Sequence, residues 1–231
     1  MKKILILAGG YSKEKEISIQ TAKSVLSELN KDKKYIIKVV NPDGQFIKVL
    51  RKFKPNVVLN LLHGRYGEDG YIQLILENEK IKYTHSGVKA SSICINKIIS
   101  KEIFLKKKIL TPRFYLLKGN IRDNLKKSLF IIKKKLNFPV VIKPINEGSS
   151  VGVYICNKKN FIQNLKKLGS EKEILVEKYI PGREIQVAIM GSKKLGAIEL
   201  QPKRKFYDYK AKYNSNAKTK HIIPINLSKK N

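Results

Sequence analysis

The sequence predicts a parallel α/β sheet in its first ninety residues, followed by an α+β half with antiparallel or mixed strands. In residues 1–91, short apolar runs alternate with segments whose apolar residues recur at helical spacing, as in Ala22, Val25, Leu26 and Leu29. From about residue 92, the apolar runs follow one another around turns such as Pro181-Gly182. Alternating strands and helices are typical of parallel sheets, and turn-linked strands are typical of antiparallel ones.

The individual elements follow from the same patterns. In the first part we expect strands at 3–8, 35–40, 57–62 and 81–84 and helices at 22–29, 46–53 and 71–76. In the second part we expect helices at 92–108 and 121–136, strands at 114–117, 138–142, 153–156, 174–179, 184–190 and 195–200, and a loop at 206–213. Parallel sheets bind ligands beyond the carboxyl ends of their strands, where Gly9-Gly10 and His63-Gly64 occur.

Composition limits the possible partners and the compartment. The 231 residues contain 49 Lys and Arg against 18 Asp and Glu, a formal net charge of +31, but only six are Arg and the lysines are spread along the chain. Nucleic-acid readers usually gather arginine and aromatics on one face, so no specific nucleic-acid partner is expected. No apolar run suits a membrane span or signal peptide. The unclustered Cys94 and Cys156 indicate a reduced, cytoplasmic setting without a membrane partner.

The segment EGSSVG at 147–152 lies between two predicted strands. Its small residues let backbone N–H groups approach an anion, and its hydroxyls add hydrogen-bond donors. Lys143, at the end of the preceding strand, and Lys97 could contact phosphate oxygens. The alternatives are a plain hairpin turn and lysines whose ammonium groups are simply solvated.

Three acidic residues and one histidine are the other candidates. Glu177 and Glu184 flank a turn, where a carboxylate can accept hydrogen bonds from ribose hydroxyls or can form part of an ordinary surface pair. Glu14 stands near a helix start, where capping is the alternative. His63 lies in a polar cluster at a strand end and could equally be structural. Residues 206–213 interleave aromatics and lysines, which suits either base stacking or a lid over phosphates.

Seven motifs in order resemble the D-alanine–D-alanine ligases of the ATP-grasp superfamily. They are LAGGYSKEKEIS at 7–18, LHGRYGEDG at 62–70, YTHSGV at 83–88, NK at 96–97, VIKP with EGSSVG at 141–152, EKY with Glu184, and FYDYKAKY at 206–213. The resemblance implies a Rossmann-like, pre-ATP-grasp domain at 1–91. It implies the ATP-grasp central domain at 92–176 and an incomplete start of the C-terminal domain at 177–231.

The resemblance also implies roles for particular residues. It implies ATP binding by Lys97, Lys143, Ser150, Glu177, Lys178, Tyr179, Ile180, Glu184, Phe206 and Lys212, with Lys97 and Lys143 on phosphates, Glu177 to Ile180 and Phe206 around adenine, and Glu184 on the ribose. Glu14, Ser149 and Tyr213 would form a hydrogen-bonded triad in which Glu14 holds the first D-alanine. His63 would lie near the acyl phosphate, and Lys212 would reach the transferred phosphoryl group.

The implied reaction is the ligation of two D-alanines for peptidoglycan. ATP converts one carboxylate to a D-alanyl phosphate, which the second amine attacks. Family members continue beyond residue 231, and that part carries their Mg²⁺ ligands, so none is assigned here and a truncated third domain with an open sheet edge is expected. The alternatives are an inactive remnant, a nucleotide-binding fragment, and a ligase for D-serine or D-lactate. A homodimer is the family expectation.

Overall fold

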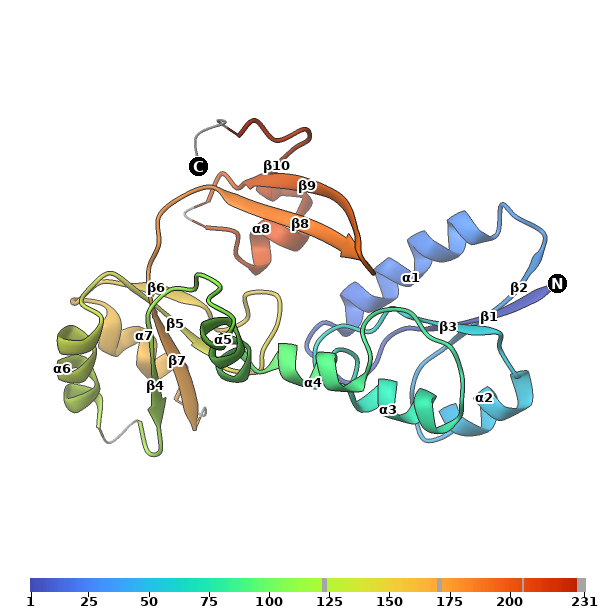
Figure 1. Cartoon of the computed structure of the whole chain (residues 1–231), viewed down its shortest axis with the longest axis horizontal. Helices are drawn as coiled ribbons and strands as arrows, with labels where there is room; N and C mark the ends of the chain where they lie inside the picture. Colours follow the sequence, from blue (N-terminus) through green and yellow to red (C-terminus); the bar gives the residue numbers. More distant parts are fainter. Residues whose placement is uncertain (122–123, 170–171, 205, 228–231) are drawn as a thin grey trace. The chain divides into compact units, whose positions relative to one another are not determined.

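The computed structural model describes residues 1–121, 124–169, 172–204 and 206–227, and these fall into two compact units (Figure 1). Unit 1 contains Met1–Thr111 with Ile145–Gly148, and unit 2 contains Pro112–Pro144 with Ser149–Asn231. This division differs from the three domains expected from the sequence, which remain a prediction. None of the described helices is both long enough and apolar enough to cross a membrane.

Unit 1 is built on a three-stranded parallel sheet, as the alternation of strands and helices predicts. Strand β1 (Lys2–Leu7) lies between β2 (Tyr35–Val40) and β3 (Val57–Asn60). The strand predicted at 81–84 was wrong, because this segment forms only an isolated bridge between Val58 and Tyr83. Two hydrogen bonds flank this bridge, from Val58 N–H to Lys82 O at 2.8 Å and from Thr84 N–H to Val58 O at 3.0 Å, and they are too few to extend a strand.

Both faces of this sheet are covered, which explains the continuous apolar run of β1. Side chains alternate between the faces of a strand. Helix α1 (Lys15–Leu29) lies on one side of the sheet, and α2 (Phe46–Phe53) and α3 (Tyr71–Asn78) lie on the other (Figure 1). Ile4 and Ile6 therefore pack toward α1, and Leu5 and Leu7 pack toward α2 and α3. The predicted helix at 92–108 is two helices, α4 (Val88–Ile95) and α5 (Lys97–Lys106). Asn96 ends the first and caps the second by accepting from two backbone N–H groups.

Unit 2 contains two antiparallel sheets, which confirms the expected antiparallel pairing. The first has the order β4-β7-β5-β6 and consists of β4 (Phe114–Lys118), β5 (Val140–Pro144), β6 (Tyr154–Cys156) and β7 (Glu173–Lys178). The second has the order β10-β9-β8 and consists of β8 (Glu184–Met190), β9 (Lys193–Gln201) and β10 (Lys220–Ile222). Among the described residues, β8 is an edge strand, and its Val187, Ile189 and Met190 are exposed.

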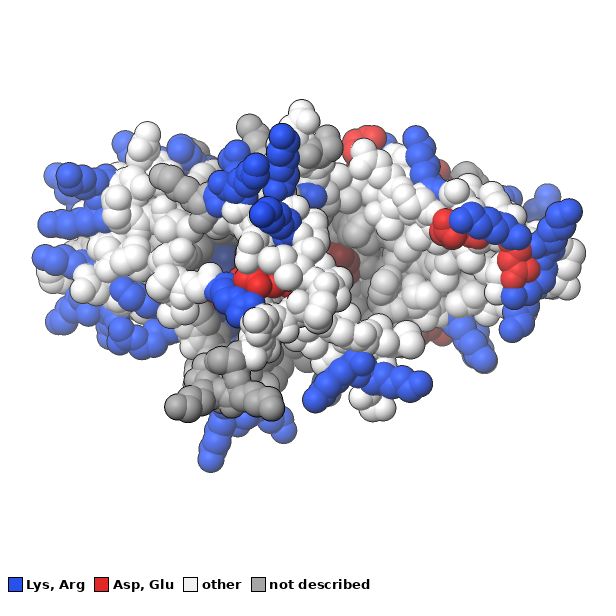
Figure 2. Space-filling model, turned by 90° about the horizontal axis from the view of Figure 1, so that it is seen from above, with Lys and Arg blue, Asp and Glu red and all other residues white. Residues whose placement is uncertain are grey.

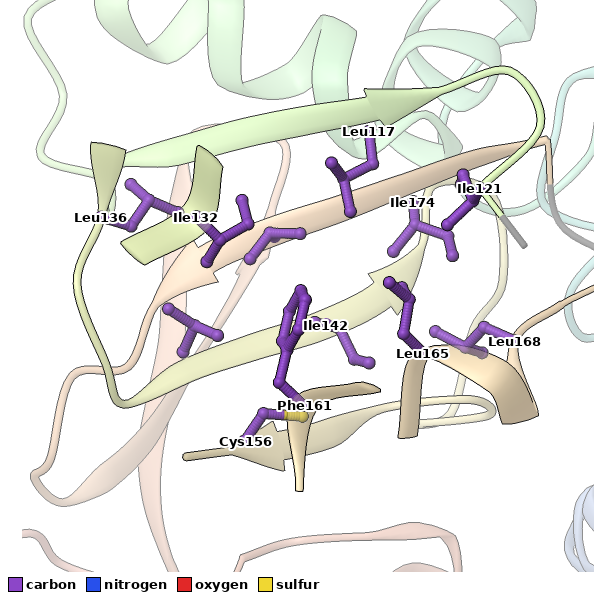
Figure 3. Packing of buried hydrophobic residues seen from close by; sticks show 12 residues of the cluster. Leu117, Ile121, Ile132, Leu136, Ile142, Cys156, Phe161, Leu165, Leu168 and Ile174 are labelled. Carbon is purple, nitrogen blue, oxygen red and sulfur yellow. The ribbon is translucent and has the colours of Figure 1, made fainter. Parts of the chain in front are cut away.

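The main core of unit 2 lies between the four-stranded sheet and two helices, α6 (Leu125–Lys135) and α7 (Phe161–Lys167). Figure 3 shows the Phe161 ring standing among side chains from the sheet and both helices. Its ring packs edge-on against Phe138 at 5.5 Å. Helix α7 has no counterpart among the predicted elements. Residues 122–123 of the helix predicted at 121–136 lie outside the described residues.

Replacement of Phe161 by alanine should lower the free energy of unfolding of unit 2 by about 3–5 kcal/mol, because this side chain is fully buried and a cavity would remain. Urea unfolding followed by circular dichroism measures the change. Phe130→Ala is the matched control, because Phe130 on α6 is 68% exposed and its loss should cost less than about 1 kcal/mol. Equal losses for the two variants would contradict this assignment of the core.

Candidate active site

The loop between β5 and β6 joins the segment that follows β9. Ser149 and Ser150 both have left-handed backbone conformations, with φ of 43° and 62°. Non-glycine residues rarely adopt this conformation, which costs energy. Both serine hydroxyls are hydrogen-bonded to the segment 206–213: Ser149 Oγ lies 2.6 Å from Tyr213 Oη, and Ser150 Oγ donates to Tyr207 O at 3.1 Å. The predicted phosphate loop and the predicted lid therefore meet within unit 2.

The lid segment contains a short helix, so the expected loop at 206–213 was partly wrong. Helix α8 (Tyr209–Tyr213) begins after Asp208, whose carboxylate accepts from Ala211 N–H at 2.8 Å, as a capping residue does. Arg204 Nε donates to both oxygens of the same carboxylate, at 3.0 and 2.9 Å. Ala211 is buried and fixes one face of the helix. An aspartate before an alanine- and lysine-rich stretch was the sequence signal for this helix.

Lys143 and Glu177 form an ion pair on the face of the four-stranded sheet that points away from α6 and α7. In the β5–β7 register, Lys143 pairs with Leu175 and Glu177 pairs with Val141, so the two charged residues are diagonal neighbours on one face. Glu177 is buried, which a carboxylate tolerates when a cation accompanies it. Lys143 is thus paired with a carboxylate and is not simply solvated. Its contact with phosphate stays a prediction.

The residues predicted around adenine and ribose lie at the end of β7 and the start of β8. Lys178 Nζ donates to Phe138 O at 3.1 Å, Tyr179 N–H donates to Pro139 O, and the Ile180 side chain is 62% exposed. Glu184 opens β8. Desolvation raises the pKa of its carboxyl group, and the charge of Lys212 opposes that rise. Burial and then the charge of Glu184 raise the pKa of the Tyr207 hydroxyl, so Glu184 lies near the lid segment. Phe206 is half-buried in the same segment.

In unit 1, Glu14 is buried although it stands at the start of α1. Glu14 is the N-cap residue of this helix, but its side chain makes no capping hydrogen bond. Two glycines lie against this carboxylate. A Cβ atom added to Gly64 would be 2.9 Å from Glu14 Oε2, and one added to Gly148 would be 3.1 Å from the same oxygen. Only residues without a side chain leave the carboxylate this space, and Gly64 also has a φ of +66°, which favours glycine.

His63 lies beside Glu14 and Glu68 in the same unit. The His63 Nδ1 atom is 3.5 Å from Glu68 Oε1, and Nε2 is 3.4 Å from the hydroxyl of Thr21. The Glu68 hydrogen bond raises the pKa of His63, partial burial opposes this, and the charges of Glu68 and Glu14 add to the rise. His63 is therefore held closer to its cationic form, which suits a position near anionic groups.

Lys97 lies at the first position of α5 and holds a segment of backbone. Its ammonium donates to Glu147 O at 2.5 Å and to Ile145 O at 3.3 Å, while its backbone N–H donates to Ile145 O at 3.0 Å. Lys13 forms an ion pair with the Glu147 side chain at 3.1 Å. These contacts attach Ile145–Gly148 to unit 1 immediately before Ser149. No local sequence pattern predicts them, because they join residues about fifty or more positions apart.

The predicted site residues thus fall into two groups. Ser149, Ser150, Tyr213, Lys143, Glu177, Glu184 and Lys212 are in unit 2, whereas Glu14, His63 and Lys97 are in unit 1. The Ser149–Tyr213 half of the expected triad is formed within unit 2, and the involvement of Glu14 stays a prediction. Among the described residues, no cluster of three or more His, Cys, Asp or Glu could hold a metal ion.

The fold is that of an ATP-binding ligase, as comparisons with known proteins show. Residues 105–231 match the family model described as "D-ala D-ala ligase C-terminus". The D-alanine–D-alanine ligase of Pelagibacter ubique is 61% identical over 230 residues, which cover 100% of this chain and 75% of the relative. The chain therefore belongs to the D-alanine–D-alanine ligase family.

Solved structures agree with this assignment. The crystal structure of the D-alanine–D-alanine ligase from Bacillus anthracis is 35% identical, with a TM-score of 0.80 over 99% of this chain and 73% of that chain. The same enzyme complexed with ATP aligns with a TM-score of 0.75 and 31% identity, over 99% of this chain and 72% of that chain. The α/β architecture predicted from the sequence is confirmed by these alignments.

Glu68→Gln should lower the pKa of His63, because the hydrogen-bonded carboxylate is the largest cause of its rise. A group whose pKa is higher in the folded than in the unfolded protein stabilises the fold below its unfolded value, about 6.5. This stabilisation is lost as the pH rises through the folded pKa, so Glu68→Gln should reduce stability more at pH 6 than at pH 9. NMR titration of the imidazole resonances and urea unfolding at both pH values test these effects.

Glu28→Gln is the control for this variant. Glu28 is an exposed carboxylate on α1 whose partner is Lys31, and its loss should leave the His63 titration unchanged. An unaltered His63 pKa in Glu68→Gln would show that the pair contributes nothing to the charge of this histidine.

Proposed function

We propose that this chain catalyses the ATP-dependent ligation of two D-alanines through a D-alanyl phosphate, and that the dipeptide serves peptidoglycan synthesis in the cytoplasm. The observation that supports this most directly is the Ser149–Tyr213 hydrogen bond, because it joins the small-residue loop to the aromatic lid where the family's reaction needs both. The 61% identity to a ligase of this name supports the same reaction.

ATP is the nucleotide that these residues suit. The Ser149–Ser150 loop follows Lys143 in the chain, and serine hydroxyls and a lysine ammonium are groups that bind phosphate oxygens. Glu184 offers acceptor oxygens for ribose hydroxyls, with Phe206, Lys178, Tyr179 and Ile180 as the adenine environment. Lys97 would add a second ammonium to the phosphates. The complex of the Bacillus anthracis relative with ATP supports this choice.

The remaining roles concern the two amino acids. Glu14 would hold the ammonium group of the first D-alanine, for which a buried carboxylate in a glycine-walled space is suited. His63, whose pKa Glu68 raises, would stabilise charge near the acyl phosphate, and Lys212 would do so at the transferred phosphoryl group. An acyl phosphate is hydrolysed when water reaches it, which explains the need for a lid closed over the loop. Mg²⁺ would reduce phosphate charge when bound; the described residues supply no cluster for it.

Phosphate release by the purified chain, with ATP, D-alanine and Mg²⁺, tests the proposal. Release should require D-alanine, and mass spectrometry should detect the dipeptide. The double variant Ser149→Ala, Tyr213→Phe should reduce the rate by about two orders of magnitude, because it removes both hydroxyls that join loop and lid. Tyr115→Phe is the matched control, since it removes a tyrosine hydroxyl from β4, outside the proposed site.

Other outcomes would favour the alternatives. ATP binding without release of phosphate would indicate a nucleotide-binding chain without turnover. Faster product formation with D-serine or D-lactate as the second substrate would indicate a related ligase. Equal rates for the double variant and Tyr115→Phe would contradict the proposed roles of Ser149 and Tyr213. Sedimentation of the same preparation would test the homodimer that the family leads us to expect.

The charge distribution is consistent with a small-molecule enzyme. Figure 2 shows lysine and arginine side chains distributed over the visible face rather than gathered into one continuous patch. The absence of a specific nucleic-acid partner stays a prediction, and binding to duplex DNA below micromolar protein at physiological salt would contradict it.

A further inference from the structure

An ion pair behind the proposed ribose contact is the feature that the reaction above leaves unexplained. Arg183 Nε donates to Glu199 Oε1 at 2.8 Å, and Nη2 donates to Glu199 Oε2 at 2.5 Å, a bidentate arrangement. The Glu199 side chain is only 5% exposed. The third nitrogen of the guanidinium, Nη1, donates to Asn226 O at 2.8 Å. One side chain therefore joins three segments: the start of β8, the middle strand β9 and the chain after β10.

The strand register places this pair on the opposite face of the sheet from Glu184. Ile185 pairs with Glu199, and Glu184 pairs with Leu200. Residues directly opposite each other point to the same face, and neighbours along a strand point to opposite faces. Arg183 and Glu199 thus occupy one face, and Glu184 occupies the other with the buried Leu200. Arg183 cannot contact a ligand held by Glu184, and any effect it has must pass through the strand.

Position and charge both suit such an indirect role. Arg183 precedes Glu184 directly, where β8 leaves the turn at 181–182, so its anchor fixes the backbone from which the Glu184 side chain projects. Hydrogen bonds from Arg183 and then Gln201 lower the pKa of Glu199 to about 2, in spite of its desolvation. The pair therefore keeps its charges from mildly acidic to alkaline pH. Lysine could not replace this arginine fully, because an ammonium group lacks the planar pair of N–H donors that bonds both oxygens of a carboxylate.

We propose that Arg183, clamped to Glu199 and Asn226, is a positioning residue that orients Glu184 toward the ribose hydroxyls of the nucleotide. The inference rests on the proposed function, because it takes Glu184 as the ribose contact. Arg183 would then determine specificity from outside the ligand site. Its contacts with Glu199 and Asn226 would set how strongly a nucleotide with ribose hydroxyls is preferred over one without them.

Binding of ATP and of 2′,3′-dideoxy-ATP to the full chain, measured by calorimetry, tests the proposal. Wild type should prefer ATP by about tenfold or more, the effect of a hydrogen bond to a charged acceptor. Arg183→Met should reduce this preference to about twofold or less, by weakening ATP binding while the dideoxy compound binds as before. Arg183→Lys should retain an intermediate preference, since it keeps the charge without the fork.

Two further variants control for effects on folding. Arg183→Met leaves a buried carboxylate without its cation, so the double variant Arg183→Met, Glu199→Leu removes both charges and should lose the preference equally. Arg51→Met removes a similar bidentate pair with Glu79 in unit 1 and should leave both affinities unchanged.

The outcomes separate this inference from the proposed function. Failure of wild type to bind ATP at all would overturn both. ATP binding with an intact preference in Arg183→Met and in the double variant would overturn the positioning role alone. Equal weakening of both nucleotides would also overturn it, because that result is expected of a merely structural pair.

Discussion

The attachment of Ile145–Gly148 to unit 1 is the contact on which the proposed site depends. The chain leaves unit 2 after Pro144, contributes these four residues to unit 1, and returns to unit 2 at Ser149. The Lys97 ammonium holds two of the four carbonyls, Lys13 holds the side chain of Glu147, and Gly148 leaves room for the Glu14 carboxylate. Ser149 therefore follows directly after Gly148, which lies against the Glu14 carboxylate in unit 1.

The Lys97 ammonium holds the base of the phosphate loop through two backbone carbonyls, Ile145 O and Glu147 O. Beyond that base, Ser149 and Ser150 have left-handed backbone conformations, and their hydroxyls are hydrogen-bonded to the lid segment.

The sequence predicted most of the fold because apolar periodicity records which faces are buried. Strands β1, β2 and β3 and helix α2 lie close to their predicted positions, since each contributes a continuous or regularly spaced apolar face to a core. Helix α7 was missed because it is short and lysine-rich, and the break at Asn96 was missed because a capping asparagine resembles any polar residue within a helix. Local signals of this kind are weak when tertiary contacts decide the outcome.

The candidate site was predicted residue by residue only through the family resemblance, and long-range partners could not be inferred from spacing. Glu177 and Lys143 form a pair because the β5–β7 register makes them neighbours, and Arg183 reaches Glu199 across a β-hairpin. The role of Lys97 is tested most directly by amide hydrogen exchange of residues 145–150 without nucleotide, in wild type, Lys97→Met and the exposed-surface control Lys52→Met. We expect faster exchange in Lys97→Met alone; unchanged exchange would show that this lysine does not fix the base of the phosphate loop.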